Sequence, residues 1–245
     1  MDYKGEFVMA DNDLILNGSG TVTGGSFQRV SINGSGTITS DVECQVFECN
    51  GSGRVKGDVM AQSCSIAGGA KIEGDIHAKE VKVHGSSTIE GKLLFLNLEV
   101  RGSTKVKKGL KGESVSVEGS IKVNGDFEAE TADFDGSFEI NGLLNADRID
   151  IGMHGRCYAQ EIGGETIKVK KKSGMLLDKL IKAFNRELHC ELIEGDTIQL
   201  EYTTAKIVRG TNVYIGPGCE IDLIEYKNDL KIDNSAKVKE SKKVE

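Results

Sequence analysis

Apolar residues recur along this chain every 16 or 17 residues. Four aligned columns contain them. One begins Leu16, Ile32, Cys49, Ile66 and ends at Ile151, a second runs from Val22 to Ile140, a third from Val42 to Leu144, and a fourth from Cys64 to Ile149. The fourth column lies two residues before the first, so both face one side of an extended strand, where successive side chains alternate between faces. Each repeat therefore predicts about three short strands.

Glycines recur with the same spacing. The first series is Gly18, Gly34, Gly51, Gly68, Gly85, Gly102, Gly119, Gly136 and Gly152. A second series lies six or seven residues after members of the first and comprises Gly24, Gly57, Gly74, Gly91, Gly109, Gly125 and Gly142. A repeat this short cannot bury an apolar face alone, so neighbouring copies must stack. We predict an all-β, three-sided parallel β-helix with coils of about 17 residues, and we expect positive φ at the second glycine, as at Gly57 and Gly74.

The register breaks after Val169. Leu177, Leu180, Ile181, Phe184 and Leu188 then follow the spacing of an amphipathic helix, with Ser173 as a candidate N-cap. Residues 165–189 hold seven basic and three acidic side chains in a chain whose net charge is −7. The coil spacing returns in the pairs Ile198 and Ile215, Ile215 and Ile232, Ile207 and Ile224, Val213 and Leu230, and Ile221 and Val238.

These patterns divide the chain into five parts. We expect a flexible leader over residues 1–13, the main β-helix over 14–170, a basic amphipathic helix inserted over 171–190, a second β-helical segment over 191–238, and a charged tail over 239–245.

Composition restricts the function. The chain has 245 residues, 5% aromatic residues and an acidic balance, which argues against nucleic acid as a partner because phosphate binding normally needs a basic stripe. The first twelve residues hold Asp2, Glu6 and Asp11 and no apolar run of the length an export signal needs, and no stretch is long enough to span a membrane. Six cysteines without disulfide-framework spacing fit a reducing compartment, so we expect a cytoplasmic protein.

Repeats such as VHGSSTIEG (83–91) and VEGSIKVNGD (117–126) resemble those of the bactofilins, bacterial polymer-forming cytoskeletal proteins. The resemblance covers roughly residues 14–165. It implies a right-handed β-helix that joins end to end without nucleotide, often at the inner face of the cell membrane. It also implies a scaffold for cell-shape, envelope or motility (flagellar) machinery. The expected partners are the protein itself and a paralogous bactofilin, with peripheral membrane contact and with no cofactor, nucleic acid or small-molecule substrate.

Two sets of residues are candidate contact sites. The uncapped ends of a β-helix expose strand edges and apolar side chains that can serve as templates for another coil. We therefore assign the polymerisation interface to Leu14, Ile15, Leu16, Val22, Leu230, Ile232 and Val238. A membrane or partner contact is assigned to the insert through Lys170, Lys171, Lys172, Leu177, Ile181 and Phe184. The alternative for the insert is a helix packed on the β-helix.

Signals for chemistry are weak. His154, Cys157, His189 and Cys190 flank the insert, but H-x-x-C and an adjacent H-C pair are poor zinc spacings, and we expect no metal or catalytic site. The alternative function is a hexapeptide-type β-helix acyltransferase, suggested by RGTNVYIGPGCEI (209–221), or another carbohydrate-active β-helix enzyme. Neither His77 nor His84 is expected in a protruding loop. Asp58, Asp75 and Asp126 are expected to form corner hydrogen bonds rather than a catalytic cluster.

Overall fold

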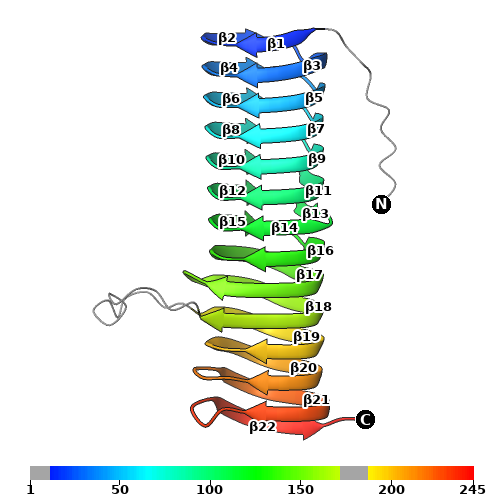
Figure 1. Cartoon of the computed structure of the whole chain (residues 1–245), viewed down its shortest axis with the longest axis vertical. Coiled ribbons are helices and arrows are strands. Elements are labelled where there is room, and N and C mark those ends of the chain that lie inside the picture. Colours follow the sequence, from blue (N-terminus) through cyan, green and yellow to red (C-terminus); the bar gives the residue numbers. More distant parts are fainter. Residues whose placement is uncertain (1–11, 172–186) are drawn as a thin grey trace, which may run out of the picture. The chain divides into compact units, whose positions relative to one another are not determined.

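The computed structural model describes residues 12–171 and 187–245, and the regular structure in these ranges is entirely β-strand. The chain divides into an N-terminal unit, Met1–Gly112, and a C-terminal unit, Glu113–Glu245. Each is a stack of parallel strands, so the predicted three-sided parallel β-helix is confirmed (Figure 1).

The N-terminal unit alternates short and long strands. A coil contains a four-residue strand and a strand of about eight residues that bends through a corner, which joins two of the three short strands expected per repeat. The strands are β1 (Asp13–Leu16), β2 (Ser19–Val22), β3 (Gly25–Ile32), β4 (Ser35–Ile38), β5 (Val42–Cys49), β6 (Ser52–Val55), β7 (Val59–Ile66), β8 (Gly69–Ile72), β9 (Ile76–Val83), β10 (Ser86–Ile89), β11 (Lys92–Val100), β12 (Ser103–Val106) and β13 (Gly109–Lys111).

The predicted apolar columns match the strand register. Leu16 pairs with Ile32 and Ile32 with Cys49, and the same 16- or 17-residue step continues to Val100. Ile32 and Cys49 are fully buried. The aliphatic stacks therefore form the core of the unit, and burial of each large side chain contributes about 1.5–3 kcal/mol.

The first series of glycines is needed for close stacking. A Cβ added at Gly85 would lie 1.9 Å from the carbonyl oxygen of Gly68, one coil earlier. Asparagine side chains bond along this corner, because Asn33 Nδ2 donates to Asn17 Oδ1 at 2.9 Å and Asn50 Nδ2 donates to Asn33 Oδ1 at 3.0 Å.

Glycines of the second series leave room for aspartate side chains of the preceding coil. Asp58 Oδ1 accepts a hydrogen bond from the backbone N–H of Asp75 at 2.7 Å, and a Cβ at Gly74 would lie 2.1 Å from that same oxygen. The expectation of positive φ in this series is met at Gly109 and is wrong at Gly57 and Gly74, since among described glycines only Gly25, Gly109 and Gly218 have it. What requires glycine here is the closeness of the neighbouring coil.

One inward row of the N-terminal unit grows in residue size along the stack from its second member onward. Its members are paired in register and are Gly36, Gly53, Ala70, Ser87 and Thr104. Ser87 and Thr104 are buried, and Ser87 Oγ donates to Thr104 Oγ1 at 3.1 Å, which satisfies both hydroxyl groups inside the core. On another face, a Cβ at Gly112 would lie 2.1 Å from the ring of Phe95, so the missing side chain makes room for that ring.

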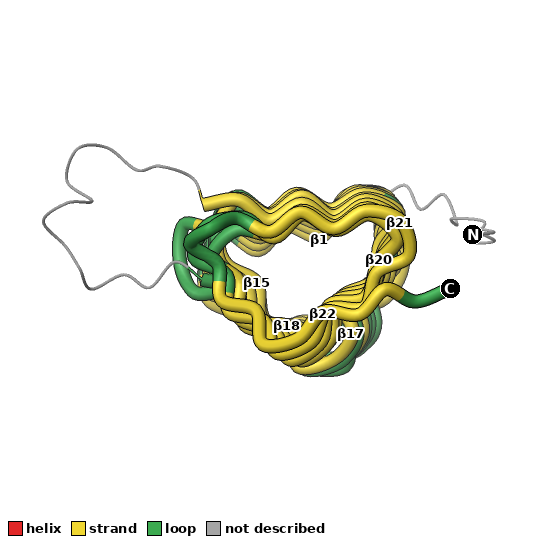
Figure 2. Tube along the Cα trace, turned by 90° about the horizontal axis from the view of Figure 1, so that it is seen from below, coloured by secondary structure: helices red, strands yellow, loops and turns green. Residues whose placement is uncertain are grey.

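The strands of the C-terminal unit begin short, and most of them are then longer because the chain runs through more corners without a break. They are β14 (Ser114–Val117), β15 (Ser120–Val123), β16 (Phe127–Phe134), β17 (Ser137–Met153), β18 (Cys157–Lys171), β19 (Leu188–Leu200), β20 (Thr203–Ile215), β21 (Glu220–Ile232) and β22 (Lys237–Lys243). Seen end-on, its last coils follow a three-sided outline (Figure 2).

Coil length varies in this unit. Ile151 pairs with Val169, which is a step of 18 residues, and Ile198 pairs with Val213, which is a step of 15. The predicted stacking of Ile198 on Ile215 is therefore wrong, because Ile215 stacks on Leu200. The predicted stacking of Ile207 on Ile224 is wrong for the same reason.

Ile207 pairs with Leu223, and Ile224 pairs with Val208. Val213 with Leu230, Ile215 with Ile232 and Ile221 with Val238 pair as predicted.

The prediction of an inserted helix is wrong wherever the described residues test it. Lys171 ends strand β18, and residues 188–190, which include Leu188 of the predicted helical stripe, begin strand β19. The remainder of the insert, 172–186, lies outside the described residues, as does the leader up to residue 11. At the other boundary, β22 continues to Lys243 within the predicted tail.

Candidate assembly surfaces

The first coil of the N-terminal unit is incompletely covered within the described residues. Leu14, Leu16 and Val22 are half-buried, whereas Val30, Ile32 and Ile38 in the same columns one coil later are fully buried. The cause is that β1 and β2 pair with described strands on one edge only, with β3 and β4.

Ile15 stands out for a different reason. It belongs to an outward row in which Ser31, Glu48, Ser65 and Lys82 follow in successive coils, and its side chain is 52% exposed. An aliphatic residue thus occupies the first position of a row that is otherwise polar.

The last coil of the C-terminal unit shows the same incomplete burial. Ile232 is 41% exposed, whereas Ile215 in the same column is fully buried, and Leu230 and Val238 are half-buried. All seven residues assigned to the polymerisation interface therefore lie in the first or last described coil, and all are partly or largely exposed.

Charge distinguishes the two coils. Residues 12–28 contain a single charged residue, Asp13, whereas residues 229–245 contain nine. In β22, Lys237 Nζ lies 2.6 Å from Glu220 Oε1 and Lys239 Nζ lies 2.7 Å from Asp222 Oδ1.

These two contacts shift the pKa values of residues that form them. The hydrogen bond that Lys237 donates to Glu220 raises the pKa of Lys237 and lowers the pKa of Glu220. The hydrogen bond that Lys239 donates to Asp222 raises the pKa of Lys239. The charged form of Lys237 and of Lys239 is therefore favoured.

Ion pairs between acidic and basic side chains also join the coils that precede the last one. Lys206 Nζ lies 2.7 Å from Glu191 Oε1, and the hydrogen bond between them raises the pKa of Lys206. Arg209 contacts Glu225 at 2.8 Å and Glu194 at 3.0 Å, which raises the pKa of the guanidinium. Each exposed ion pair of this kind contributes little to stability. Together, the pairs determine which charged side chains can lie beside each other on neighbouring coils.

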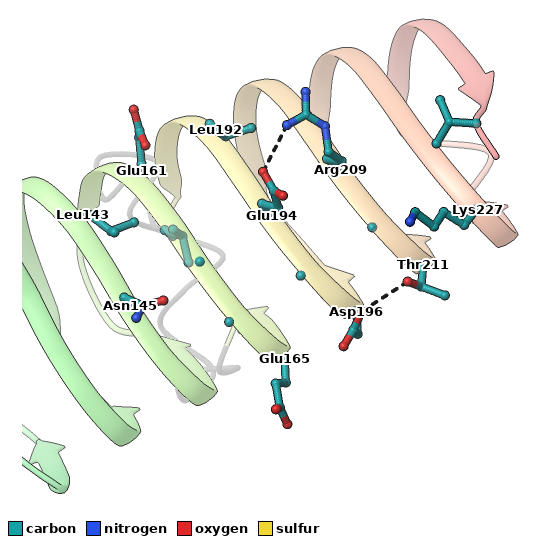
Figure 3. Close-up of a pocket in the computed structure, with 16 residues that line it drawn as sticks. Leu143, Asn145, Glu161, Glu165, Leu192, Glu194, Asp196, Arg209, Thr211 and Lys227 are labelled. Carbon is teal, nitrogen blue, oxygen red and sulfur yellow. Dashed lines mark hydrogen bonds and ion pairs between the residues drawn. The ribbon is translucent and has the colours of Figure 1, made fainter.

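A groove of about 560 Å³ runs along one face of the C-terminal unit (Figure 3). Its floor is a glycine row, Gly164, Gly195 and Gly210, in which each residue pairs with the next. Along its walls, Arg209 pairs with Glu194, and Thr211 Oγ1 donates to Asp196 Oδ1 at 3.2 Å (Figure 3). The sequence columns missed this groove because its glycines are 31 and 15 residues apart, although a search at variable spacing would find them.

The second predicted contact site is only partly described. Lys170 and Lys171 are exposed, and Lys171 Nζ lies 4.4 Å from the ring centroid of Tyr202, within the range of a cation–π contact. Lys172, Leu177, Ile181 and Phe184 lie outside the described residues. No described helix is long and apolar enough to cross a membrane.

The corner aspartates make the predicted backbone contacts. Asp75 Oδ1 accepts from the N–H of Lys92 at 2.8 Å, and Asp126 Oδ1 accepts from the N–H of Leu143 at 3.0 Å. Asp58 does the same with Asp75, so these carboxylates bond the next coil instead of converging on a site.

The histidines and cysteines near the insert are not brought together. His154 Nε2 lies 2.6 Å from Asp135 Oδ1, and His189 Nε2 lies 2.8 Å from Glu187 Oε1. Cys157 and Cys190 are buried, and burial raises the pKa of each thiol to about 12. No cluster of three or more potential metal ligands occurs in the described ranges.

The structure also shows where the other two histidines lie. His77 lies within strand β9 and His84 immediately follows it, with its Nε2 3.5 Å from Glu99 Oε1.

Comparison with known proteins places the chain in a family. Residues 1–94 match the family model described as bactofilin, polymer-forming cytoskeletal. An uncharacterised protein of Bacillus subtilis (strain 168), YhbE, is 59% identical over 233 residues, which cover 94% of this chain and 98% of that protein. The chain belongs to the bactofilin family.

A second uncharacterised protein of the same organism, YhbF, is 41% identical to this bactofilin over 97 residues, 39% of each chain. No solved structure matches the chain. By its family, this bactofilin is a polymer-forming cytoskeletal protein.

Proposed function

We propose that this bactofilin is a non-enzymatic scaffold whose molecules join through their first and last coils, without nucleotide, to organise cell-shape, envelope or motility machinery. The observation that carries the proposal is the incomplete burial of Leu16 and Ile232 in columns whose other members are buried. A further coil stacked on either one would complete the column and pair the exposed strand edge.

Purified protein imaged by negative-stain electron microscopy tests the proposal. We expect filaments, and Leu16→Lys is expected to shorten or abolish them because it places a charge in a joint between coils. Leu94→Lys is the matched control, because Leu94 is a half-buried leucine in β11, in the interior of the N-terminal unit. Filaments unchanged by Leu16→Lys, or absent from the wild type, would contradict the proposal.

We also propose that Lys170 and Lys171 bring the scaffold to an anionic membrane surface. The support is their exposure and the basic character of residues 165–189, since each lysine near an anionic surface contributes about 1 kcal/mol. Flotation with vesicles containing anionic lipid should recover the wild type and lose a Lys170→Glu, Lys171→Glu variant. Equal recovery of both proteins would show that these lysines do not bind lipid.

A further inference from the structure

One outward row of the C-terminal unit is largely aliphatic. The row comprises Leu143, Glu161, Leu192, Ile207 and Leu223, which pair in register from coil to coil. Its four aliphatic members are half-buried. Leu192, Ile207 and Leu223 lie on the successive strands β19, β20 and β21, so they form an unbroken aliphatic stripe that crosses the coils.

The same corner position is polar in the N-terminal unit. There, aspartates directly precede the buried residues of the third column, as Asp41 precedes Val42 and Asp58 precedes Val59. Asp41 Oδ1 accepts a hydrogen bond from the backbone N–H of Asp58 at 2.9 Å. An aliphatic side chain cannot form that bond, and at this outward position it remains partly exposed. An aliphatic stripe among polar rows is typical of a surface that another molecule covers.

The aliphatic stripe adjoins the glycine-floored groove, since Leu192 lines it. On β18, Glu161 and Glu165 lie on opposite sides of the glycine floor (Figure 3). The floor carries no side chains, because a Cβ at Gly164, Gly195 or Gly210 would collide with a backbone oxygen of the preceding coil. A side chain of a partner can therefore enter between the two walls and reach the backbone of the floor.

The charges along the groove differ between its two halves. On β18 and β19 the charged lining residues are all acidic, and on β20 and β21 they are all basic. The acidic set is Glu161, Glu165, Glu194 and Asp196, and the basic set is Arg209 and Lys227. Glu194 is paired with Arg209 at 3.0 Å, whereas Glu161, Glu165 and Asp196 have no ion pair with a described residue. A complementary ligand is therefore basic over β18 and acidic over β21.

The spacing of the coils favours a helical ligand over an extended one. Stacked coils lie about 4.8 Å apart and an α-helix advances about 5.4 Å per turn, so a helix along the groove offers about one side chain to each coil. An extended strand repeats one face about every 6.6 Å and loses this register by about 2 Å per coil. The distance from β18 to β21 is about 14 Å, which corresponds to about ten helical residues.

We propose that the groove binds an amphipathic α-helix of another protein. The aliphatic face of the helix packs on Leu192, Ile207 and Leu223. Its N-terminal half presents lysine or arginine to Glu161 and Glu165, and the positive end of the helix dipole lies over these same acidic coils. Its C-terminal half presents a carboxylate to the basic coils. This inference rests on the proposed scaffold role, to which it adds the surface for a partner protein.

A synthetic peptide tests the charge pattern. The probe has about 14 residues, with leucines at helical spacing, lysines in its N-terminal half and glutamates in its C-terminal half. Its binding to the full-length protein is measured by fluorescence anisotropy. Glu161→Lys together with Glu165→Lys should weaken binding about tenfold, because two attractions become repulsions. Glu113→Lys together with Glu130→Lys is the matched control, since both glutamates are exposed in the same unit and lie outside the groove.

A second probe keeps the leucines and replaces every lysine with glutamate. It should bind about tenfold more weakly than the first, because it is repelled by the acidic coils. A wild-type protein that does not bind the first probe, or binds both probes equally, would overturn the proposal. Equal weakening by the groove variant and the control variant would also overturn it.

Leu192→Asp tests the aliphatic stripe. The fold accepts aspartate at this corner, as Asp58 shows in the N-terminal unit, so the circular dichroism spectrum should not change. Binding of the first probe should fall about tenfold or more, because a charge then lies under the aliphatic face of the helix. Leu94→Asp is the matched control, since Leu94 is a half-buried leucine of the N-terminal unit. Undiminished binding to the Leu192→Asp protein would contradict the proposed contact.

Two further outcomes would assign the groove to a different occupant and overturn the proposal. Residues 172–186 also contain basic and aliphatic residues. Binding of the probe only after these residues are replaced by a glycine–serine linker would assign the groove to the chain itself. Loss of filaments in the Leu192→Asp variant would assign it to a second copy. Loss of probe binding while wild-type filaments form contradicts only the groove, whereas absence of wild-type filaments contradicts the scaffold.

Discussion

Gly85→Ala should destabilise the N-terminal unit strongly. The new methyl carbon would lie 1.9 Å from the carbonyl oxygen of Gly68 and 2.4 Å from that of Ala67, and both atoms belong to the backbone of the preceding coil. No side-chain rotation can relieve contacts with backbone atoms, so the two coils must separate at this corner.

The size of the effect follows from the bonds that separation breaks. Gly85 N donates to Ile66 O at 3.1 Å and Ser86 N donates to Gly68 O at 2.9 Å. Each contributes about 1 kcal/mol net, and looser packing of the neighbouring aliphatic columns adds about 1–2 kcal/mol. We expect a loss of about 3–4 kcal/mol in the free energy of unfolding.

Urea unfolding followed by far-ultraviolet circular dichroism measures this loss as a lower midpoint. Gly69→Ala is the matched control, because a Cβ at Gly69 meets no atom within 4 Å. That variant should be neutral or more stable by up to about 1 kcal/mol, since alanine restricts the unfolded chain. A loss below about 1 kcal/mol for Gly85→Ala, or equal effects of the two changes, would refute close stacking as the reason for the glycine.

Three further changes test the bonds between coils. Asp58→Ala removes the acceptor of the Asp75 N–H. Because this exposed donor can bond water instead, we expect the urea midpoint to show a loss of only about 0.5–1 kcal/mol in the free energy of unfolding. A loss above about 3 kcal/mol would contradict that reasoning. Thr104→Val leaves the buried Ser87 hydroxyl without its partner and should lower the free energy of unfolding by about 1–3 kcal/mol. Ser87→Ala in the same chain should restore part of this loss. A double variant less stable than Thr104→Val would argue against the pair. Burial raises the pKa of Cys64 from 9.0 to about 12, so between these pH values the unfolded chain releases the proton and the folded chain retains it. Stability should fall as pH rises through this window, and less steeply in Cys64→Ala; identical slopes would show that this thiol does not contribute.

The N-terminal unit was predictable because its corners repeat. The step from Ile32 to Cys49 to Ile66 keeps one length, so a column read from the sequence is a column in the structure. In the C-terminal unit the corners change length, and a fixed period then aligned Ile198 with Ile215 although Val213 is its partner.

The candidate site was predictable in part. The open columns at Leu16 and Ile232 followed from where the repeat begins and ends. The glycine-floored groove did not follow from a fixed period, because its glycines Gly164, Gly195 and Gly210 are unequally spaced in the sequence. Positive φ at Gly57 was a wrong expectation, because spacing cannot show whether a glycine serves a turn or a close approach.

The graded inward row of the N-terminal unit bears on how the chain finds its register while folding. A repetitive β-helix invites slippage by one whole coil, since each strand meets a nearly equivalent neighbour. From Gly53 to Thr104 the row gives successive coils different inward volumes, and Phe95 fits over Gly112, where any side chain would collide with its ring. The core thus distinguishes the coils from Gly53 to Thr104 from one another, so a shift of these strands by one coil would place residues of the wrong size against each other.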